Sequence, residues 1–151
     1  MEKSQFRHVS RLRVRNYEVD WQGIVHNANY LLYCETGRIE YLKGLGVKLD
    51  LHSITNENRV VLVRNEINCR ASAFFDEELE IYTRISAIRE TSFIFESMIE
   101  KSANHELVCD NLAVHVWLDS NREPVRVNDE FRQIVGEFEG SNLNLKRGQQ
   151  R

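Results

Sequence analysis

The stretch that decides the fold runs from Tyr17 to Gly46, "YEVDWQGIVHNANYLLYCETGRIEYLKGLG". It begins with a short polar segment that holds an aspartate, a glycine and two asparagines, and it continues into a helical pattern from about Ala28 to Lys43. Asn27 or Asn29 is able to cap the start of this helix, and Gly44 is available for a left-handed cap at its end. The apolar residues of the helix do not keep to one stripe. This pattern predicts a helix that is enclosed on several sides.

Five further segments alternate with a period of two, which is typical of half-buried strands. The expected core faces carry Leu12 and Val14; Val61, Val63, Ile67 and Cys69; Leu79, Ile81, Ile85 and Ala87; Phe93, Phe95 and Ile99; and Val108, Leu112, Val114, Val116 and Leu118. The last segment also carries Ala113, His115 and Trp117 on its odd face, so both of its faces can be covered. Short links between the last three segments favour an antiparallel meander. Arg11, Arg13 and Arg15 are expected on the solvated face of an edge strand.

A second, shorter helix is expected to start at Asn128, a suitable cap, with Phe131, Ile134, Val135 and Phe138 on its inward side. The order of one strand, one helix and four strands predicts an α+β domain. In it, a curved antiparallel sheet of about five strands wraps a long central helix, and a short C-terminal helix follows. We expect a single domain over residues 1–138 and a polar, mobile tail over 139–151.

Composition limits the classes of protein to which the chain can belong. Its 151 residues are enough for one domain, and 42% hydrophobic with 28% charged residues is typical of a folded protein. No run of about 18 apolar residues is present, which argues against a transmembrane segment. The net charge of −3 argues against nucleic acid as a partner. The N-terminal residues do not resemble a secretory signal, so we expect a cytoplasmic protein.

The cysteines and histidines give no metal-binding pattern. Three widely spaced cysteines, Cys34, Cys69 and Cys109, contain no C-x-x-C, which fits free thiols in a reducing compartment. The five histidines do not form the pairs that zinc requires. No metal ligand and no cofactor are therefore expected.

Asp20 is the first candidate for chemistry. It precedes the helix by about one turn's reach, and at that helix N-terminus unpaired N–H groups and the positive end of the dipole come together. A carboxylate beside such donors suits acyl transfer, because the donors stabilise an oxyanion while the carboxylate activates water or attacks the carbonyl itself. The alternative is a solvated or capping acid without a catalytic role.

The segment "YEVDWQGIVHNANY" resembles the motif of the 4-hydroxybenzoyl-CoA thioesterase family, whose members are hotdog-fold acyl-CoA thioesterases. The matching positions are Glu18 and Asp20, Gly23, Asn29 and Tyr30, and on the helix Glu35 and Arg38. Further on, "CRASAFFDEELEI" resembles a second segment of the family, although Ser72 stands where many members have proline. The resemblance covers roughly Val9 to Leu118.

The resemblance implies that Asp20 is the catalytic nucleophile or general base and that the backbone N–H of Asn27 polarises the thioester carbonyl. Gly23 would allow the tight turn between them. Glu35 is the reserve carboxylate, unless it forms a structural ion pair with Arg38.

The implied substrate is an acyl-CoA, and no cofactor takes part. The implied substrate-binding residues are His26, Asn29, Tyr30, Arg70 and Arg89, and Arg89 is what remains of a basic cluster that holds the CoA phosphates in some members. The resemblance also implies a homodimer whose sheets join edge to edge, or a dimer of dimers.

Three alternatives stay open at this point. A non-catalytic module of the same fold would bind acyl-CoA without hydrolysing it, and an acyl-ACP thioesterase would use a protein carrier. A hotdog dehydratase would need a His-Phe-Pro type motif, which the sequence lacks, since its one proline is Pro124.

Overall fold

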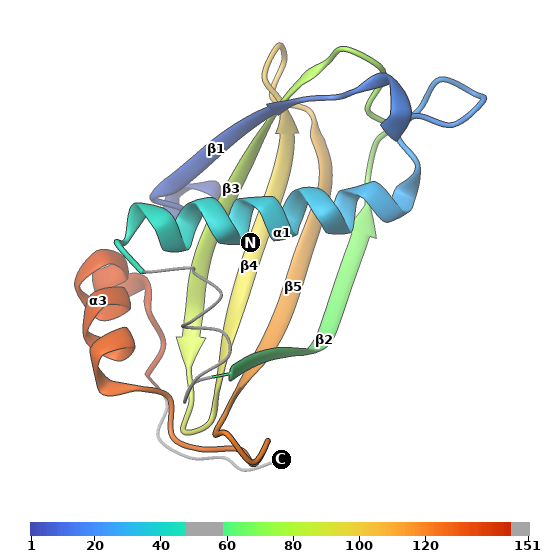
Figure 1. The fold of residues 1–151 in the computed structure, drawn as a ribbon. Helices are drawn as coiled ribbons and strands as arrows, with labels where there is room; N and C mark the ends of the chain where they lie inside the picture. The colour runs from blue at the N-terminus through green and yellow to red at the C-terminus, as the bar shows by residue number, and fades with distance from the viewer. Residues whose placement is uncertain (48–58, 146–151) are drawn as a thin grey trace.

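The computed structural model describes residues 1–47 and 59–145, and it has an α+β fold in which helix α1 lies across an antiparallel sheet (Figure 1). The elements are β1 (His8–Arg13), α1 (Asn27–Gly44), β2 (Arg59–Cys69), β3 (Glu78–Ile88), β4 (Ser92–Lys101), β5 (Leu107–Leu118) and α3 (Asp129–Glu139), with short 3-10 helices at Lys3–Gln5, Asn16–Glu18 and Gly140–Asn142. The five strands have the order β1-β3-β4-β5-β2, and every neighbouring pair is antiparallel. The expected architecture and the meander of the last three strands are confirmed. The edge position of β1, with its exposed Arg11 and Arg13, is also confirmed.

Helix α1 has 18 residues and is of moderate length rather than the long helix expected. Its cap is His26, whose Nδ1 accepts a hydrogen bond from the Ala28 N–H at 3.2 Å. Asn29 instead uses its side-chain amide to donate to the Glu18 carbonyl at 2.8 Å. At the other end, Gly44 is still helical, and the residue with left-handed backbone is Gly46, at φ +79°. The caps expected at the asparagines and at Gly44 are therefore wrong by one to three positions.

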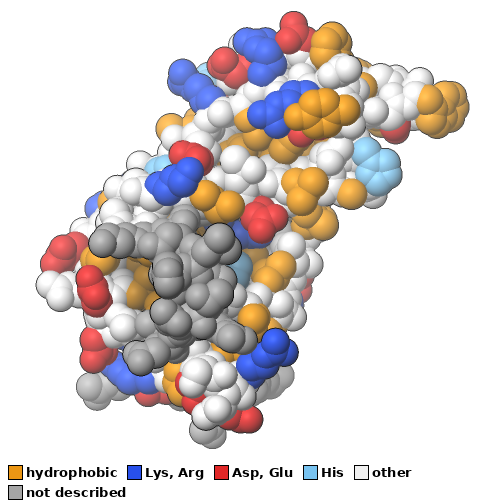
Figure 2. Space-filling model, in the orientation of Figure 1, with side chains coloured by type: hydrophobic (Ala, Val, Ile, Leu, Met, Phe, Trp, Pro, Cys, Tyr) orange, Lys and Arg blue, Asp and Glu red, His pale blue; other side chains and the backbone are white. Residues whose placement is uncertain are grey.

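One side of α1 is buried against the sheet, and the other side is not. The buried residues of the helix are Tyr30, Tyr33, Cys34, Gly37, Arg38 and Tyr41. On the opposite side, Leu32 is 57% exposed and Ile39 is 40% exposed, and apolar side chains are visible over this face of the molecule (Figure 2). Within the described chain, the apolar residues that broke the stripe pattern thus lie in part on an uncovered face.

The helix approaches the sheet most closely at Gly37. A Cβ atom at this position would lie 2.6 Å from Ile81 Cγ2 and 2.7 Å from Thr83 Oγ1, both on β3. Real Cβ atoms do not come so close to their neighbours, so only glycine fits the observed spacing between α1 and β3.

Two β-bulges change which residues face the core. In β2, Leu62 pairs with His115 and Arg64 pairs with Val114, so Val63 is an extra residue. Val61 therefore faces the side opposite to Ile67 and Cys69, contrary to the expected face. In β3, a bulge after Ile85 turns Ala87 outward and brings Ile88 into the core, where it is 1% exposed.

The core face of β5 is its odd face, which the alternation did not single out. Cys109, Asn111 and Ala113 are each 0% exposed, whereas the apolar even residues Leu112 and Val114 are only half-buried on the outer face. Polar Asn111 can lie inside because Arg38 donates to its Oδ1 at 3.3 Å and its amide donates to the Glu66 carbonyl at 2.8 Å.

The C-terminal helix α3 closes one end of the sheet. Its cap is Asn128, as expected, because the Asn128 side chain accepts from the N–H groups of Glu130 and Phe131 at 2.9 and 3.2 Å. The helix extends to Glu139, which is fully buried and accepts hydrogen bonds from the Tyr41 hydroxyl at 2.7 Å and the Ile85 N–H at 3.1 Å. Residue 139, where a mobile tail was expected to begin, is instead the last residue of this helix and belongs to the core.

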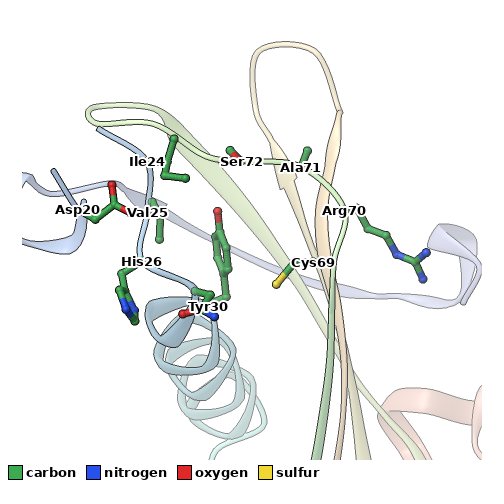
Figure 3. Close-up of a pocket in the computed structure, with 10 residues that line it drawn as sticks. Asp20, Ile24, Val25, His26, Tyr30, Cys69, Arg70, Ala71 and Ser72 are labelled. Carbon is green, nitrogen blue, oxygen red and sulfur yellow. The ribbon is translucent and has the colours of Figure 1, made fainter. Parts of the chain in front are cut away.

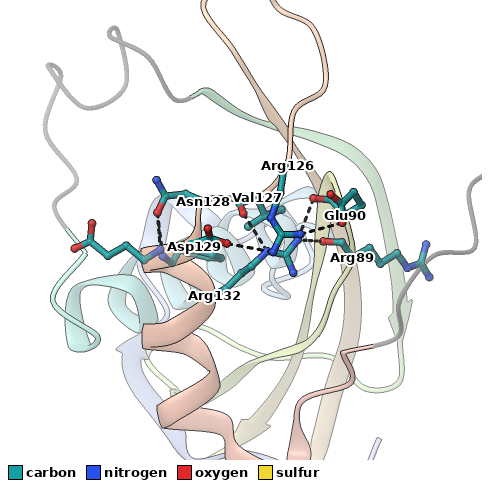
Figure 4. Close-up of polar contacts among 9 residues, drawn as sticks. Arg89, Glu90, Arg126, Val127, Asn128, Asp129 and Arg132 are labelled. Atoms are coloured by element: carbon teal, nitrogen blue, oxygen red, sulfur yellow. Dashed lines mark hydrogen bonds and ion pairs between the residues drawn. The ribbon is translucent and has the colours of Figure 1, made fainter.

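The link between β3 and β4 holds the start of α3 (Figure 4). Arg132 donates to the carbonyls of Arg89 and Glu90, the latter at 3.0 Å. Arg126 pairs with the carboxylates of Glu90 at 3.0 Å and Asp129 at 3.2 Å. The backbone of Arg89 is therefore used to position α3, while its side chain points away from this network.

The approach at Gly37 gives a test of how α1 is placed. Gly37→Ala should lower the free energy of unfolding by about 1–2 kcal/mol, because overpacking costs more than the roughly 1 kcal/mol of helix propensity that alanine adds. The matched control is Gly136→Ala in the middle of α3, where an added Cβ meets nothing within 4 Å; it should raise stability by about 0.5–1 kcal/mol. Urea unfolding followed by circular dichroism measures both. Stabilisation by both substitutions would contradict the close approach.

Candidate active site

The Glu18 carbonyl joins the two ends of the polar loop before α1, and the Asp20 N–H closes the loop further by donating to the Ile24 carbonyl at 2.9 Å. The Glu18 carbonyl accepts both the His26 N–H at 3.0 Å and the Asn29 side-chain amide at 2.8 Å, which brings the two ends of the loop together. The Val25 N–H donates to the Ala73 carbonyl at 2.9 Å. The loop is thereby fixed to the segment that follows β2, far away in the sequence.

Asp20 lies at the tip of this loop in a hydrogen-bonded turn. Its carbonyl accepts from the Gly23 N–H at 3.0 Å, and its Oδ1 accepts from the Gln22 N–H at 2.7 Å. Gly23 has φ +81°, a left-handed conformation that glycine adopts without steric cost. Oδ2 of the half-buried Asp20 accepts no hydrogen bond from the described residues.

A cavity of about 450 Å³ opens between this loop, the N-terminus of α1 and the end of β2 (Figure 3). Its lining residues are Asp20, Ile24, Val25, His26, Asn27, Tyr30, Cys69, Arg70, Ala71 and Ser72. Two stretches that are separate in the sequence, residues 20–30 and 69–72, thus form one site. Of the expected catalytic residues, Asp20 and Asn27 both line the cavity, and Gly23 shapes the turn beside them.

Asn27, which lines the cavity at the N-terminus of α1, has an unused backbone donor. The Ala28 N–H is taken by His26, and the Asn29 N–H donates to the His26 carbonyl at 2.9 Å. The Asn27 N–H has no acceptor in the part of the chain that the structure describes. A free N–H at the positive end of a helix dipole is suited to binding an oxygen that carries negative charge.

Tyr30 forms the buried wall of the cavity. It is 3% exposed, and its hydroxyl oxygen accepts a hydrogen bond from the Ala73 N–H at 3.0 Å. Burial raises the pKa of the Tyr30 hydroxyl, so the phenol stays protonated at neutral pH. The contact holds the segment after β2 against the helix.

The two arginines expected to bind substrate lie at opposite ends of the sheet. Arg70 lines the cavity and pairs with the carboxylate of Asp110 at 2.9 Å. Arg89 follows the end of β3, which begins near the cavity and runs away from it for 11 residues, about 35 Å of strand. Within one protomer, Arg89 and the cavity are not brought together.

Glu35 does not line the cavity and is exposed on α1. The ion pair considered between Glu35 and Arg38 is not formed, because Arg38 turns inward to Asn111. Asn29 is close to the site, but its side-chain amide donates to the Glu18 carbonyl and helps to close the loop.

Five lining residues were not among the expected site residues: Ile24, Val25, Cys69, Ala71 and Ser72. The last three belong to the second segment of the family resemblance, "CRASAFF", and this likeness was the available signal. Nothing in the alternation pattern indicates that the end of β2 meets the loop at Asp20. The contact arises from the tertiary fold, through pairings such as the bridge between Ile24 and Phe74.

One group of side chains within the described ranges has the composition of a metal site. Glu80, Glu100 and His105 place one ligand atom each within 4.8 Å of one another, on the sheet face opposite α1. Both carboxylates already have cationic partners, since Lys3 lies 2.6 Å from Glu100 and Arg11 lies 3.1 Å from Glu80. We interpret this group as an ion-pair network that ties the N-terminal residues to the sheet.

The comparisons with known proteins identify the family and the fold of the chain. A family model described as the Thioesterase-like superfamily matches residues 14–135. The acyl-acyl carrier protein thioesterase ATL2, chloroplastic, of Arabidopsis thaliana is 32% identical over 136 residues, which are 90% of this chain and 72% of that protein.

Two solved structures show the same fold. A thioesterase from Thermus thermophilus, complexed with coenzyme A and Zn, is 26% identical, with 90% of this chain and 97% of that chain covered and a TM-score of 0.77. A 1,4-dihydroxy-2-naphthoyl-CoA thioesterase from Synechocystis has a TM-score of 0.78 at 18% identity, with 84% and 93% covered, and this likeness concerns the fold alone. The hotdog-like thioesterase fold is confirmed, while the narrower 4-hydroxybenzoyl-CoA family stays a prediction. No described helix meets the length and hydropathy needed to cross a membrane.

The contact between Tyr30 and Ala73 can be tested directly. Tyr30→Phe removes the acceptor of a buried N–H, so the free energy of unfolding should fall by about 1–3 kcal/mol. Tyr17→Phe is the matched control, since Tyr17 is 73% exposed, and it should change stability by less than about 0.5 kcal/mol. Urea denaturation of both variants is the measurement. Equal, small effects would show that the hydrogen bond does not stabilise the cavity wall.

Proposed function

The chain belongs to the Thioesterase-like superfamily and is a thioester hydrolase, and on this premise we propose that Asp20 and the N-terminus of α1 hydrolyse the thioester of an acyl-CoA. The observation that supports the proposal most strongly is that Asp20 and Asn27, whose N–H has no acceptor among the described residues, line the same cavity. One group supplies a base or nucleophile, and the other is a donor for the oxyanion.

Two routes fit these groups. In the first, Asp20 accepts a proton from water, the water oxygen attacks the thioester carbon, and the oxyanion is stabilised by the Asn27 N–H; the C–S bond then breaks, and CoA leaves as a thiol after protonation. In the second, an Asp20 oxygen attacks the carbon itself, CoA leaves, and water hydrolyses the resulting anhydride. In both routes the products are a free carboxylic acid and CoA, and the reaction involves no redox step.

The proposed substrate contacts follow from the same residues. Tyr30 and His26 line the cavity at the N-terminus of α1, and Asn29 keeps the loop closed. Arg70 lines the cavity, but its side chain is directed away from Asp20 and pairs with Asp110 (Figure 3), so it would have to leave this pair to meet a phosphate of the carrier. Arg89 can take part only from a neighbouring subunit, because it follows Ile88, the last residue of β3, at the end of the strand away from the cavity.

Acyl carrier protein is the second candidate carrier. It is favoured by the two Arabidopsis relatives, both described as acyl-acyl carrier protein thioesterases and 32% and 31% identical to this chain. It is also favoured by the pairing of Arg70 with Asp110, which leaves the cavity without a strongly basic rim. Both relatives are described as chloroplastic, and a cytoplasmic location for this chain stays a prediction.

We further propose a homodimer in which two sheets join at β2. This strand is at an edge of the sheet, and Val60, Val61, Leu62 and Val63 are 43%, 39%, 45% and 57% exposed. An exposed apolar edge favours pairing with another chain, whereas the other edge, β1, carries the exposed charges of Arg11 and Arg13. A neighbour at β2 would also stand beside the cavity, which includes the end of this strand.

The catalytic role of Asp20 is tested by Asp20→Asn. The amide keeps an oxygen for the Gln22 N–H but removes the carboxylate, so thioester turnover should fall at least roughly 100-fold with the fold unchanged. Asp119→Asn is the matched control, because Asp119 Oδ1 also accepts from turn N–H groups, at 2.8 and 3.0 Å, yet it does not line the cavity. Thiol release from benzoyl-CoA, short-chain and long-chain acyl-CoAs, and acyl-ACPs measures activity and carrier preference together.

The outcomes separate the candidates. Unchanged turnover in Asp20→Asn would exclude Asp20 and direct attention to Glu35. Tight acyl-CoA binding without turnover in the wild-type chain would favour a binding module of the same fold. A single turnover in ¹⁸O-water that leaves the label in the aspartate would establish attack by Asp20 itself, with water then adding to the aspartyl carbon of the anhydride.

The position of the dimer interface is tested by Val63→Lys. A lysine on the β2 edge should shift the molecular mass measured by light scattering from dimer to monomer at micromolar concentration, because it places a charge in the apolar contact. The control is Val9→Lys on the opposite edge strand, where Val9 is 46% exposed, and this variant should remain dimeric. Dissociation by Val9→Lys alone would place the interface at β1 instead.

A further inference from the structure

The three cysteines are far apart in the sequence, but Cys69 lines the cavity and Cys34 and Cys109 lie in the core behind it. Cys69 is the last residue of β2 and pairs in register with Cys109 on β5. Cys34 on α1 packs in the same apolar cluster as Cys109, and both are 0% exposed. Cys69 is exposed and lines the cavity, and its sulfur lies on the side of the strand that faces Tyr30 (Figure 3).

The register brings Cys69 and Cys109 within reach of a covalent bond. The Arg70 N–H donates to the Val108 carbonyl at 2.7 Å, so the pair formed by Arg70 and Val108 is a hydrogen-bonded one. In an antiparallel ladder the two kinds of pair alternate, and the neighbouring Cys69 and Cys109 are therefore a non-hydrogen-bonded pair, with Cα atoms about 4.5 Å apart. This separation lies within the range of roughly 4.4–6.8 Å found for disulfides.

The two thiols differ in their access to solvent, and this difference determines which of them reacts first. A hydrogen bond with the Cys34 thiol, together with burial, raises the pKa of the Cys109 thiol, so this thiol stays protonated and out of contact with solvent. Cys69 opens to the cavity, so a solvent-borne reagent meets Cys69 first. Cys34 and Cys109 have no exposed atom through which such a reagent could reach them directly.

We propose that Cys69 and Cys109 are a reversible thiol–disulfide site in the cavity wall, and that its reaction partner is a low-molecular-weight disulfide. The Cys69 thiolate attacks the reagent disulfide, a mixed disulfide forms on Cys69, and one reagent thiolate leaves and is protonated. Cys109 then loses its proton and attacks the Cys69 sulfur, the Cys69–Cys109 bond forms, and the second reagent thiol leaves. Two protein thiols are oxidised, and one reagent disulfide is reduced to two thiols.

This site goes beyond the proposed hydrolysis and does not require it. The mixed disulfide would place the reagent's thiol half in the 450 Å³ cavity that also holds Asp20 and Asn27. Substrate and reagent would therefore exclude one another at this stage. The final disulfide frees the cavity again and withdraws the Cys109 sulfur from Cys34.

The test uses the full chain and glutathione disulfide as the reagent. The reduced protein is equilibrated in buffers with different ratios of reduced to oxidised glutathione, quenched with acid, alkylated with N-ethylmaleimide, digested and mapped by mass spectrometry. We expect two thiols to be lost together and one cross-linked peptide pair that contains Cys69 and Cys109. Cys69→Ser and Cys109→Ala should each abolish the cross-link, whereas Cys34→Ala, the control, should retain it.

The wild-type measurement is decisive even where a buried variant fails to fold. Glutathione retained on Cys69 without a protein disulfide would overturn the proposal, and so would a cross-link that contains Cys34. Three thiols that all remain alkylated at the most oxidising ratio would overturn it as well. None of these readouts depends on thioester turnover, so a failure here is distinguishable from a failure of the proposed hydrolysis.

Discussion

The contact between α1 and β3 at Gly37 is the constraint on which the rest of the structure depends. With an added Cβ only 2.6 Å from Ile81, no other residue allows the helix axis to lie at this height above the sheet. The height matters because it determines where the N-terminus of the helix lies relative to the end of β2. Tyr30 can reach the Ala73 N–H at 3.0 Å only if the helix is this close, and that bond forms the cavity wall. The close packing at Gly37, in the middle of the helix, thus determines where the residues of the candidate site lie at the helix N-terminus.

The loop before α1 is closed by equally few contacts. The Glu18 carbonyl accepts two hydrogen bonds, and the Ile24 carbonyl accepts the Asp20 N–H at 2.9 Å. Asp20 is left with one carboxylate oxygen engaged by Gln22 and the other unengaged by the described residues. A carboxylate that is held in orientation by one oxygen and open at the other can accept a proton or attack a carbon without first giving up a structural bond.

Much of the fold follows from the sequence because the burial pattern is local. The strands, the helix order and the cap at Asn128 all follow from periodicity and from side chains within a few residues. The faces of β2 and β3 do not, because each contains a bulge, after Leu62 and after Ile85, and one extra residue turns every later side chain to the other side of the strand. Alternation also favoured the apolar even face of β5, whereas the polar Asn111 lies inside through its bonds to Arg38 and Glu66. For the site, the position of Asp20 before the helix made it a candidate and the family resemblance added Asn27, while the place of Cys69 depends on a tertiary contact that no local pattern encodes.

The unused groups of the cavity carry a thermodynamic consequence. A buried N–H without an acceptor costs about 1–3 kcal/mol, and a buried unpaired carboxylate costs more, so the Asn27 N–H and the free oxygen of Asp20 are tolerated only where water can reach them. The cavity is therefore expected to be wet before the substrate binds, and its opening to solvent is part of what keeps the protomer stable. When a thioester enters, its carbonyl oxygen replaces water at the N–H, and the donor is already oriented by the helix, so no reorganisation is needed as charge develops on that oxygen. The same opening to solvent also admits other small thiol or disulfide compounds. Such compounds can reach Cys69, which is exposed in the cavity wall, but not Cys34 and Cys109, which are buried behind it.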